Sequence, residues 1–271
     1  VNGLFRPDRD ALVDLLRGLD AGQWDLPTVC EGWSVKDVAL HVLGGDLGNI
    51  AGRRDGLWAL QPEPGETMGV FIGRINRQWV EAARRMTPRL IVELLEWSGP
   101  RLFEHLEQLD PMGTSGEVSW AAPGPAPVWL DVAREYTERW LHQQHIRDAV
   151  GVPGQRDSGF LGPVVATFVH ALPMALKDAA APAGSRLQVD VRGEGGGTWT
   201  VVRAGDDGPL RGWELRAGSE GDPAASVSMD TDTAWRLLTL GLDEEAAAAR
   251  VRQAGDATLT RCALRAVAII A

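Results

Sequence analysis

Two acidic and two imidazole side chains recur at helical spacing between residues 135 and 145. Glu138 and His142 are four residues apart, and Glu135 and His145 lie close to the same stripe, because a helix turns by about 100° per residue. Carboxylate and neutral imidazole are good zinc ligands, and one ion can bridge an i, i+4 pair. The spacing therefore indicates a metal site. The alternative is a solvated polar face on which Glu138 and His142 form only a helical ion pair.

A third donor must come from another element, and His41 is the candidate. Ser34 and Asp37 form a capping box, which marks the start of the helix that carries His41. Gly44 and Gly45 on this helix indicate close approach by another backbone or by a ligand, since glycine inside a helix costs about 1 kcal/mol relative to alanine. His41 supplies the third donor if this helix packs beside the helix of Glu138 and His142. The alternative for a histidine on an apolar face is a hydrogen-bonded core residue.

The elements that must position these residues are predicted from periodicity. Apolar residues at helical spacing predict helices over 8–19, from 34 onward, over 66–85, 88–109 and 128–150. Residues 111–127 are rich in Gly, Pro and Ser, so we expect a loop over the mouth of a bundle, and Gly151 ends the last helix. Asn76 falls among apolar residues of the third helix and is a candidate for lining a pocket. His105 has charged neighbours and is interpreted as a surface residue.

The pattern changes after Gly159. Residues 161–180 predict a helix disturbed by Pro173, and period-two runs at 187–191, 198–202, 212–216 and 225–229 predict an antiparallel sheet of about four strands. Helices near 232–240 and 257–270 are expected to cover it. The sequence therefore predicts an α+β two-domain protein with a bundle of four main helices over 1–155 and an α+β domain over 156–271. We expect the boundary between Gly151 and Gly162.

Composition restricts the function classes. The chain has 271 residues, 44% of them hydrophobic, and a net charge of -10, so we expect a soluble acidic protein that binds no nucleic acid. No apolar run approaching about 20 residues and no signal-peptide pattern are recognised, so a cytoplasmic protein without a membrane partner is expected. Cys30 and Cys262 are interpreted as free thiols. Cys30 precedes a helix N-terminus and could be a nucleophile, but a small buried residue is preferred. His170 and Cys262 are assigned to packing.

The run from Pro27 to His41, P-T-x-C-x-G-W-S-V-x-D-V-x-x-H, resembles the mycothiol-dependent maleylpyruvate isomerase family, a branch of the DinB-like metal-binding four-helix bundles. The resemblance continues at Glu138-x-x-x-His142 and covers about residues 5–155. It implies that His41, Glu138 and His142 are metal ligands. The second domain looks like the C-terminal domain of this family, which is itself similar to sterol carrier proteins. Two departures concern specificity: His145 stands where members often have aspartate, and Leu242 stands where many have arginine.

Two imidazoles and one carboxylate leave an ion such as zinc an open position, where the pKa of a bound water or thiol falls. The resemblance implies that the thiol is mycothiol, the metal zinc or nickel, and the reaction isomerisation of, or transfer to, a small electrophile. The few lysines, Lys36 and Lys177, agree with an actinobacterial host. The alternatives are a metal-dependent hydrolase that activates water, and a non-catalytic protein that binds metal and an apolar ligand. His145 is expected outside the first coordination shell, lining the pocket.

Overall fold

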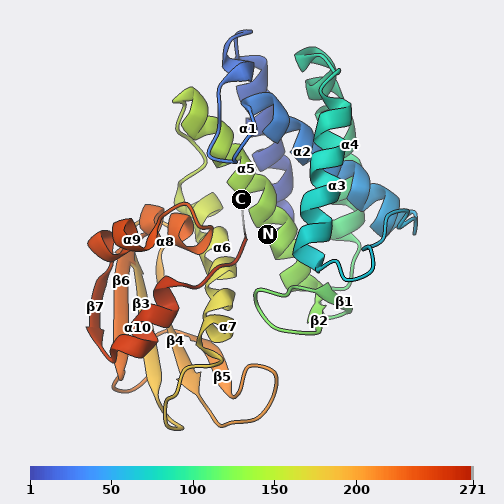
Figure 1. The fold of residues 1–271 in the computed structure, drawn as a ribbon. Helices are drawn as coiled ribbons and strands as arrows, with labels where there is room; N and C mark the ends of the chain where they lie inside the picture. Colours follow the sequence, from blue (N-terminus) through green and yellow to red (C-terminus); the bar gives the residue numbers. More distant parts are fainter. Residues whose placement is uncertain (270–271) are drawn as a thin grey trace. The chain divides into compact units, whose positions relative to one another are not determined.

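The computed structural model describes residues 1–269, and the chain divides into two compact units (Figure 1). Unit 1 comprises Val1–Leu109 and Arg139–Gly154, and unit 2 comprises Asp110–Glu138 and Gln155–Ala271. The division passes through one continuous helix, α5 (Val128–Val150). Each unit is made of two segments that alternate along the sequence. The predicted domains, 1–155 and 156–271, stay a prediction.

Unit 1 is a helical bundle built from four complete helices and the second half of α5 (Figure 1). The helices are α1 (Phe5–Arg17), α2 (Val35–Asn49), α3 (Met68–Ala83) and α4 (Pro88–Glu107). A short π-helical segment, Ile50–Arg54, extends α2. Apolar side chains from all these helices share one core, whose members include Leu12, Leu16, Val38, Leu40, Leu43, Val80, Ile91, Leu95 and Ile146. The predicted helical bundle is confirmed.

The start of α2 is formed by the predicted capping box. The Asp37 amide donates to Ser34 Oγ at 3.3 Å, and the Ser34 amide donates to Asp37 Oδ2 at 3.1 Å. Both bonds satisfy backbone groups that the first turn of a helix leaves unpaired. The carboxylate of Asp37 also accepts from Arg84 Nε at 2.9 Å, which ties the start of α2 to the end of α3. The phase of α2, and with it the direction of His41, follows from this cap.

The close approach expected at Gly44 and Gly45 comes from a side chain of α3. A Cβ atom on Gly44 would lie 2.4 Å from Trp79 Cδ1, whereas a Cβ on Gly45 would meet nothing within 4 Å. Trp79 Nε1 donates to the carbonyl of Leu40 at 2.7 Å, so the indole occupies the space beside Gly44 where α2 lacks a side chain. The group that approaches is therefore a side chain, and the expectation of another backbone or a ligand at the two glycines is wrong. Gly44 accommodates α3.

Unit 2 begins with a hairpin where a loop was predicted. Strands β1 (Thr114–Glu117) and β2 (Pro125–Pro127) pair antiparallel with an irregular register. Val118, Ala121, Ala126 and Leu130 are buried together beneath the hairpin. These apolar residues give the segment a small core of its own, which is why it forms strands in spite of its Gly, Pro and Ser content.

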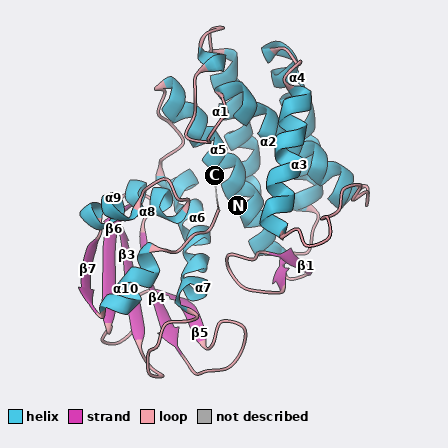
Figure 2. Cartoon of the chain, viewed as in Figure 1, coloured by secondary structure: helices cyan, strands magenta, loops and turns pink. Residues whose placement is uncertain are grey.

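The sheet of unit 2 has five strands in the order β5-β4-β3-β6-β7 (Figure 2). Its strands are β3 (Arg186–Arg192), β4 (Gly197–Arg203), β5 (Trp213–Ala217), β6 (Ala225–Asp230) and β7 (Arg252–Gly255). The pairs β3/β4 and β4/β5 are antiparallel as expected, but β3/β6 is parallel. A further strand, β7, pairs antiparallel with β6. Strand β7 was not predicted, because its four residues are all exposed and show no alternation.

The helices of unit 2 are α6 (Ser158–Phe168), α7 (Leu172–Leu176), α8 (Thr231–Leu238), α9 (Glu244–Arg250) and α10 (Ala257–Leu264). Helices α7, α8 and α10 contact strands of the sheet (Figure 2). The single helix expected over 161–180 is divided by a 3-10 turn, Val169–Ala171, just before Pro173, since proline removes a helical hydrogen bond. The last helix ends at Leu264, short of 270, and residue 270 itself lies outside the described residues.

One stretch of unit 2, Ser158–Leu176, is long and apolar enough by length and composition to cross a membrane, with a mean hydropathy of 1.6. The expectation that no apolar run approaches this length is therefore wrong. An 18-residue segment of this stretch is 56% buried inside the protein, and core helices of folded domains have a similar length and composition.

Candidate metal centre

Three side chains from two helices converge at the predicted site. His41 projects from α2, and Glu138 and His142 project from adjacent turns of α5. The candidate ligand atoms of the three residues all lie within 4.8 Å of one another. The rings of His41 and His142 meet edge to face with their centroids 4.4 Å apart, and the two residues are only 8% and 4% exposed. The structure thus brings together the three residues that the sequence singled out.

This donor set fits one divalent ion. Two donors bound to the same zinc ion through bonds of about 2.0–2.2 Å cannot lie more than about 4.4 Å apart, so small side-chain movements close the set. Two imidazoles and a carboxylate satisfy three positions of a tetrahedral ion and leave one for a water or a substrate atom. The unit boundary passes between Glu138 and Arg139, but Glu138 and His142 belong to one continuous helix.

A fixed positive charge lies one helical turn before Glu138. Arg134 Nη2 is 2.8 Å from Asp131 Oδ1 and 2.6 Å from Glu135 Oε1. Burial alone would lower the pKa of Arg134, but the charges of Glu135 and Asp131, with a contribution from Glu138, raise it above its ordinary value. Arg134 therefore stays charged, and its field favours the ionised form of Glu138 that a metal ion requires.

His145 lies with Cys30 instead of with His41 and Glu138. Its Nδ1 is 3.3 Å from Cys30 Sγ, and its ring centroid is 5.3 Å from that of His142. Its placement outside the first coordination shell of an ion at His41, Glu138 and His142 stays a prediction. Cys30 is buried and free, in agreement with its assignment as a buried thiol. The contact between Cys30 and His145 could not be predicted, because the two residues are 115 positions apart in the sequence.

A buried ionic cluster around Asp46 was not predicted from the sequence. Asp46 on α2 is 0% exposed. It accepts hydrogen bonds from Arg9 Nη1 at 2.7 Å, Ser98 Oγ at 2.7 Å and Arg139 Nη2 at 3.0 Å. Burial by itself would raise the pKa of Asp46, but the two arginines outweigh it and hold the pKa below its usual value. This one carboxylate thereby ties together α1, α2, α4 and α5, the helices that position His41 and His142.

Asp8 behaves differently from Asp46, although arginines surround both. Gln143 Nε2 donates to Asp8 Oδ1 at 2.9 Å and to the Asp8 carbonyl at 3.0 Å. Arg147 Nη2 in turn donates to Gln143 Oε1 at 2.8 Å. Burial raises the pKa of Asp8 to about 7, because the charges of Arg9, Arg139 and Arg147 only partly compensate the loss of water. The carboxyl group therefore titrates near neutral pH.

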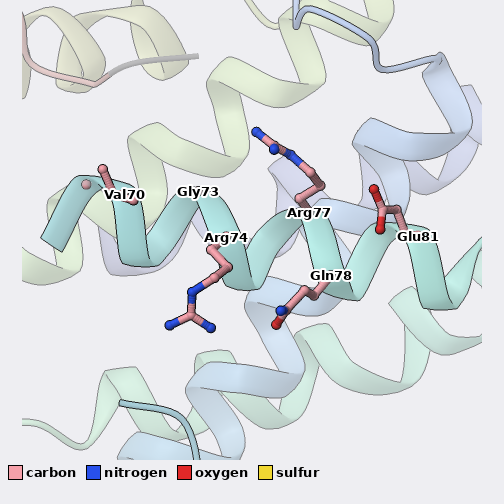
Figure 3. A pocket seen from close by; sticks show the side chains of 7 residues that line it. Val70, Gly73, Arg74, Arg77, Gln78 and Glu81 are labelled. Atoms are coloured by element: carbon pink, nitrogen blue, oxygen red, sulfur yellow. The ribbon is translucent and has the colours of Figure 1, made fainter. Parts of the chain in front are cut away.

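Two adjoining cavities lie along α3. The first, of about 620 Å³, is lined by Gly69, Val70, Gly73, Arg74, Arg77, Gln78 and Glu81 (Figure 3). The second, of about 440 Å³, shares Arg77 and Glu81 and is also lined by Glu31, Gly32, Trp33, Val80 and Arg84. The ring of Trp33 lies 5.1 Å from that of His41. Trp33 thus connects the second cavity to the donor set.

Arg77 is the cation at the junction of the two cavities. Figure 3 shows Arg77 and Glu81 on one side of α3, and Arg74 and Gln78 on the other. Arg74 is neutralised by Glu66, with Nη2 and Oε2 2.7 Å apart. Arg77 is exposed and has no ion pair with any residue of the described range 1–269. Asn76 is half-buried on the same helix and is not among the described residues that line either cavity, so its pocket role stays a prediction.

The remaining histidines lie outside the site. His105 is half-buried near the end of α4. His170 packs edge to face on Trp129 with ring centroids 5.4 Å apart, and burial lowers its pKa. The assignment of His170 to packing agrees with this contact. Cys262 is free and partly exposed.

The chain is similar to known proteins in sequence over its N-terminal part and in its fold. The family model of the mycothiol maleylpyruvate isomerase N-terminal domain matches residues 5–147. Two solved structures are similar over 93% of this chain and 91% of theirs, each with a TM-score of 0.53 and 13% identity. They are the mycothiol-dependent maleylpyruvate isomerase and a histidine-to-alanine mutant of it. At this identity the likeness shows the fold alone.

A third solved structure, Sterol Carrier Protein 2 Like 2 from Aedes Aegypti, covers 38% of this chain and 95% of its own length at 14% identity. Its TM-score of 0.29 supports no structural argument. No curated protein sequence matches the chain.

Proposed function

The chain belongs to the family of the mycothiol maleylpyruvate isomerase N-terminal domain, and from this premise we propose that it is a metal-dependent enzyme acting on a low-molecular-weight thiol. The single observation that carries the proposal is the convergence of His41, Glu138 and His142, whose ligand atoms lie within 4.8 Å of one another. The family favours mycothiol as the thiol and a small electrophile as the second substrate. Zinc is the metal that this donor set suits best, with nickel as the alternative.

The residues have separate roles in this proposal. His41, Glu138 and His142 hold the ion, which when bound supplies a positive charge that lowers the pKa of the thiol. The positive charge of Arg134, one helical turn before Glu138, favours a carboxylate at that residue, and the ring of Trp33 lies 5.1 Å from that of His41. Asp46 holds α2 and α5 at a fixed separation through Arg139. The donors are therefore pre-positioned before substrate arrives, which reduces the reorganisation that accompanies reaction.

The thiol chemistry accounts for two outcomes with one first step. The sulfur forms a C–S bond with the electrophile, and the electrons of its C=C bond move onto the conjugated carbonyl. Rotation about the resulting single bond and reversal of the addition give an isomer, whereas proton uptake at carbon gives a stable thioether. Arg77, at the junction of the cavities beside Trp33, can pair with a carboxylate of the substrate.

Elemental analysis of the purified protein, beside an assay with maleylpyruvate in the presence and absence of mycothiol, tests the proposal. We expect about one metal ion per chain, loss of turnover on chelation, recovery with zinc or nickel, and no turnover without thiol. Turnover that proceeds equally well without thiol would instead indicate a hydrolase that activates water. A protein that holds metal but turns over nothing and binds apolar ligands would be the non-catalytic alternative.

A further inference from the structure

A second donor set overlaps the first at His142. The candidate ligand atoms of Cys30, His142 and His145 also lie within 4.8 Å of one another, and all three residues are buried. Within this set Cys30 Sγ and His145 Nδ1 are 3.3 Å apart. Sulfur and nitrogen bound to one tetrahedral zinc, at about 2.3 and 2.0–2.1 Å, would be roughly 3.5 Å apart. The observed separation therefore matches two ligands of a common ion.

The thiol is held in this position by the turn that precedes α2. The Cys30 amide donates to Thr28 Oγ1 at 3.2 Å, and the Cys30 carbonyl accepts from the Trp33 amide at 2.9 Å. The Thr28 amide and hydroxyl both donate to the Trp33 carbonyl, at 3.0 and 2.9 Å. The turn is thus closed by its own hydrogen bonds, which fix the backbone position of Cys30 without a bound ion. The second donor, His145, lies three residues beyond His142 on α5.

The two sets differ in chemical softness. His41, Glu138 and His142 offer two nitrogens and one oxygen, whereas Cys30, His142 and His145 offer two nitrogens and one thiolate sulfur. Soft thiolate ligands favour zinc and softer ions over hard ones, and coordination deprotonates the thiol outright. Because the imidazole of His142 belongs to both sets, occupation of one set weakens the other.

We propose that Cys30, His142 and His145 form a second metal position, selective for thiophilic ions, that competes with the first position for His142. It goes beyond the proposed function, in which Cys30 and His145 have no role. If both positions exist, the position that an ion occupies depends on whether it prefers oxygen or sulfur ligands. An ion that prefers oxygen occupies the Glu138 side, and a thiophilic ion moves toward Cys30.

Cobalt(II) substitution tests this proposal, because a thiolate bound to cobalt gives a near-ultraviolet charge-transfer band that nitrogen and oxygen ligands do not give. Metal-free protein is titrated with cobalt(II) to saturation. We expect the band in the wild type, a stronger band at one equivalent in Glu138→Gln, where the competing set is weakened, and no band in Cys30→Ser. Cys262→Ser is the matched control and should retain it.

The absence of the band at saturation in the wild type would overturn the proposal, as would a band that persists in Cys30→Ser. The wild-type measurement decides even if a variant fails to fold. The result is separable from the proposed function. A cobalt–thiolate band together with turnover that chelation does not change would refute the proposed function and support this second site. Metal-dependent turnover without the band would support the proposed function and refute the second site.

Discussion

At the scale of single residues, His142 has the most consequences, since it belongs to both donor sets. We expect His142→Ala to lose metal content and activity together while far-ultraviolet circular dichroism changes little, because alanine is the best helix former. Metal content by elemental analysis and thiol-dependent turnover are the measurements. His105→Ala, a histidine on α4 outside the site, is the matched control. Full metal occupancy in His142→Ala would refute the assignment of the ligands.

Arg77 is expected to affect binding more than chemistry. Arg77→Ala removes the unneutralised cation at the junction of the α3 cavities, so the KM of a carboxylate substrate should rise by about tenfold, equivalent to about 1.4 kcal/mol, with little change in kcat. Arg89→Ala, an exposed arginine on α4 paired with Glu93, should leave both constants unchanged. Steady-state kinetics at several salt concentrations measure this. An unchanged KM would show that the carboxylate binds elsewhere.

Asp8 predicts a pH dependence of stability. Its folded-state pKa of about 7 exceeds its ordinary value of 3.8, so between these values the folded protein keeps a proton that the unfolded chain releases. This contribution is fully present below the ordinary pKa and is lost as pH rises through about 7, with a slope of at most about 1.4 kcal/mol per pH unit.

Asp8→Asn should abolish the fall of the unfolding free energy with pH between about pH 4 and about pH 7, the interval between the two pKa values. It should also stabilise the protein at higher pH. Denaturant titrations at a series of pH values provide the comparison. Asp14→Asn, at an exposed position of the same helix, should leave the profile as it is in the wild type. Parallel profiles for the wild type and Asp8→Asn would contradict the buried-carboxyl interpretation.

The convergence of His41, Glu138 and His142 was predictable because each residue belongs to a local pattern. His41 follows a capping box, and Glu138 and His142 are an i, i+4 pair. The partners of Asp46 were not predictable in this way. Arg9, Ser98 and Arg139 are 37, 52 and 93 residues from it, and nothing in a local window indicates that an arginine is buried against a particular carboxylate. The same holds for the contact between Cys30 and His145.

At the scale of elements, the two glycines of α2 provide a matched pair. Gly44→Ala forces a Cβ against Trp79, and overpacking of this kind costs about 1–3 kcal/mol, against a gain in helix propensity of about 1 kcal/mol. We expect a net loss of stability and a displaced α3. Gly45→Ala meets nothing within 4 Å and should stabilise the protein by up to about 1 kcal/mol. Chemical denaturation and Trp fluorescence measure the two effects, and equal changes would contradict the packing described.

Helix prediction succeeded where caps and periodicity agreed. Helix α5 was expected over 128–150 and is Val128–Val150, closed by Gly151 at a φ of 70°, a backbone conformation that glycine adopts at little cost. Sheet prediction succeeded for strand existence and failed for topology. The parallel pairing of β3 with β6 depends on which edge of the β3–β4–β5 meander the returning chain meets, and side-chain alternation carries no information about that choice.

At the scale of the whole molecule, the interleaved units predict an unusual response to proteolysis. Arg156 lies between α5 and α6 in a partly exposed segment, so limited trypsin digestion should cut after it. Unit 2 contains contacts that cross this cut: Tyr136 Oη donates to the Phe160 carbonyl at 3.3 Å, and Trp129 packs on His170. The two fragments should therefore co-elute in size-exclusion chromatography and separate only in denaturant.

Arg156→Gln should resist this cut and is the control for its position. Fragments that separate under native conditions would instead show that residues 110–138 belong with the N-terminal bundle, as the predicted domain limits of 1–155 and 156–271 require.

The order of segments along the chain also affects how the protein is made. Unit 1 needs residues 139–154 to complete its bundle, but the ribosome first synthesises 110–138, which belong to unit 2. During synthesis, helices α1 to α4 therefore expose the apolar surface that later packs against residues 139–154. Chaperones bind chains in this state, and such chains aggregate readily. His41 emerges about a hundred residues before its partners on α5. We expect ribosome-bound chains that end before His142 to bind no metal, so that metal loading begins only after residue 142 of the 271 has been added.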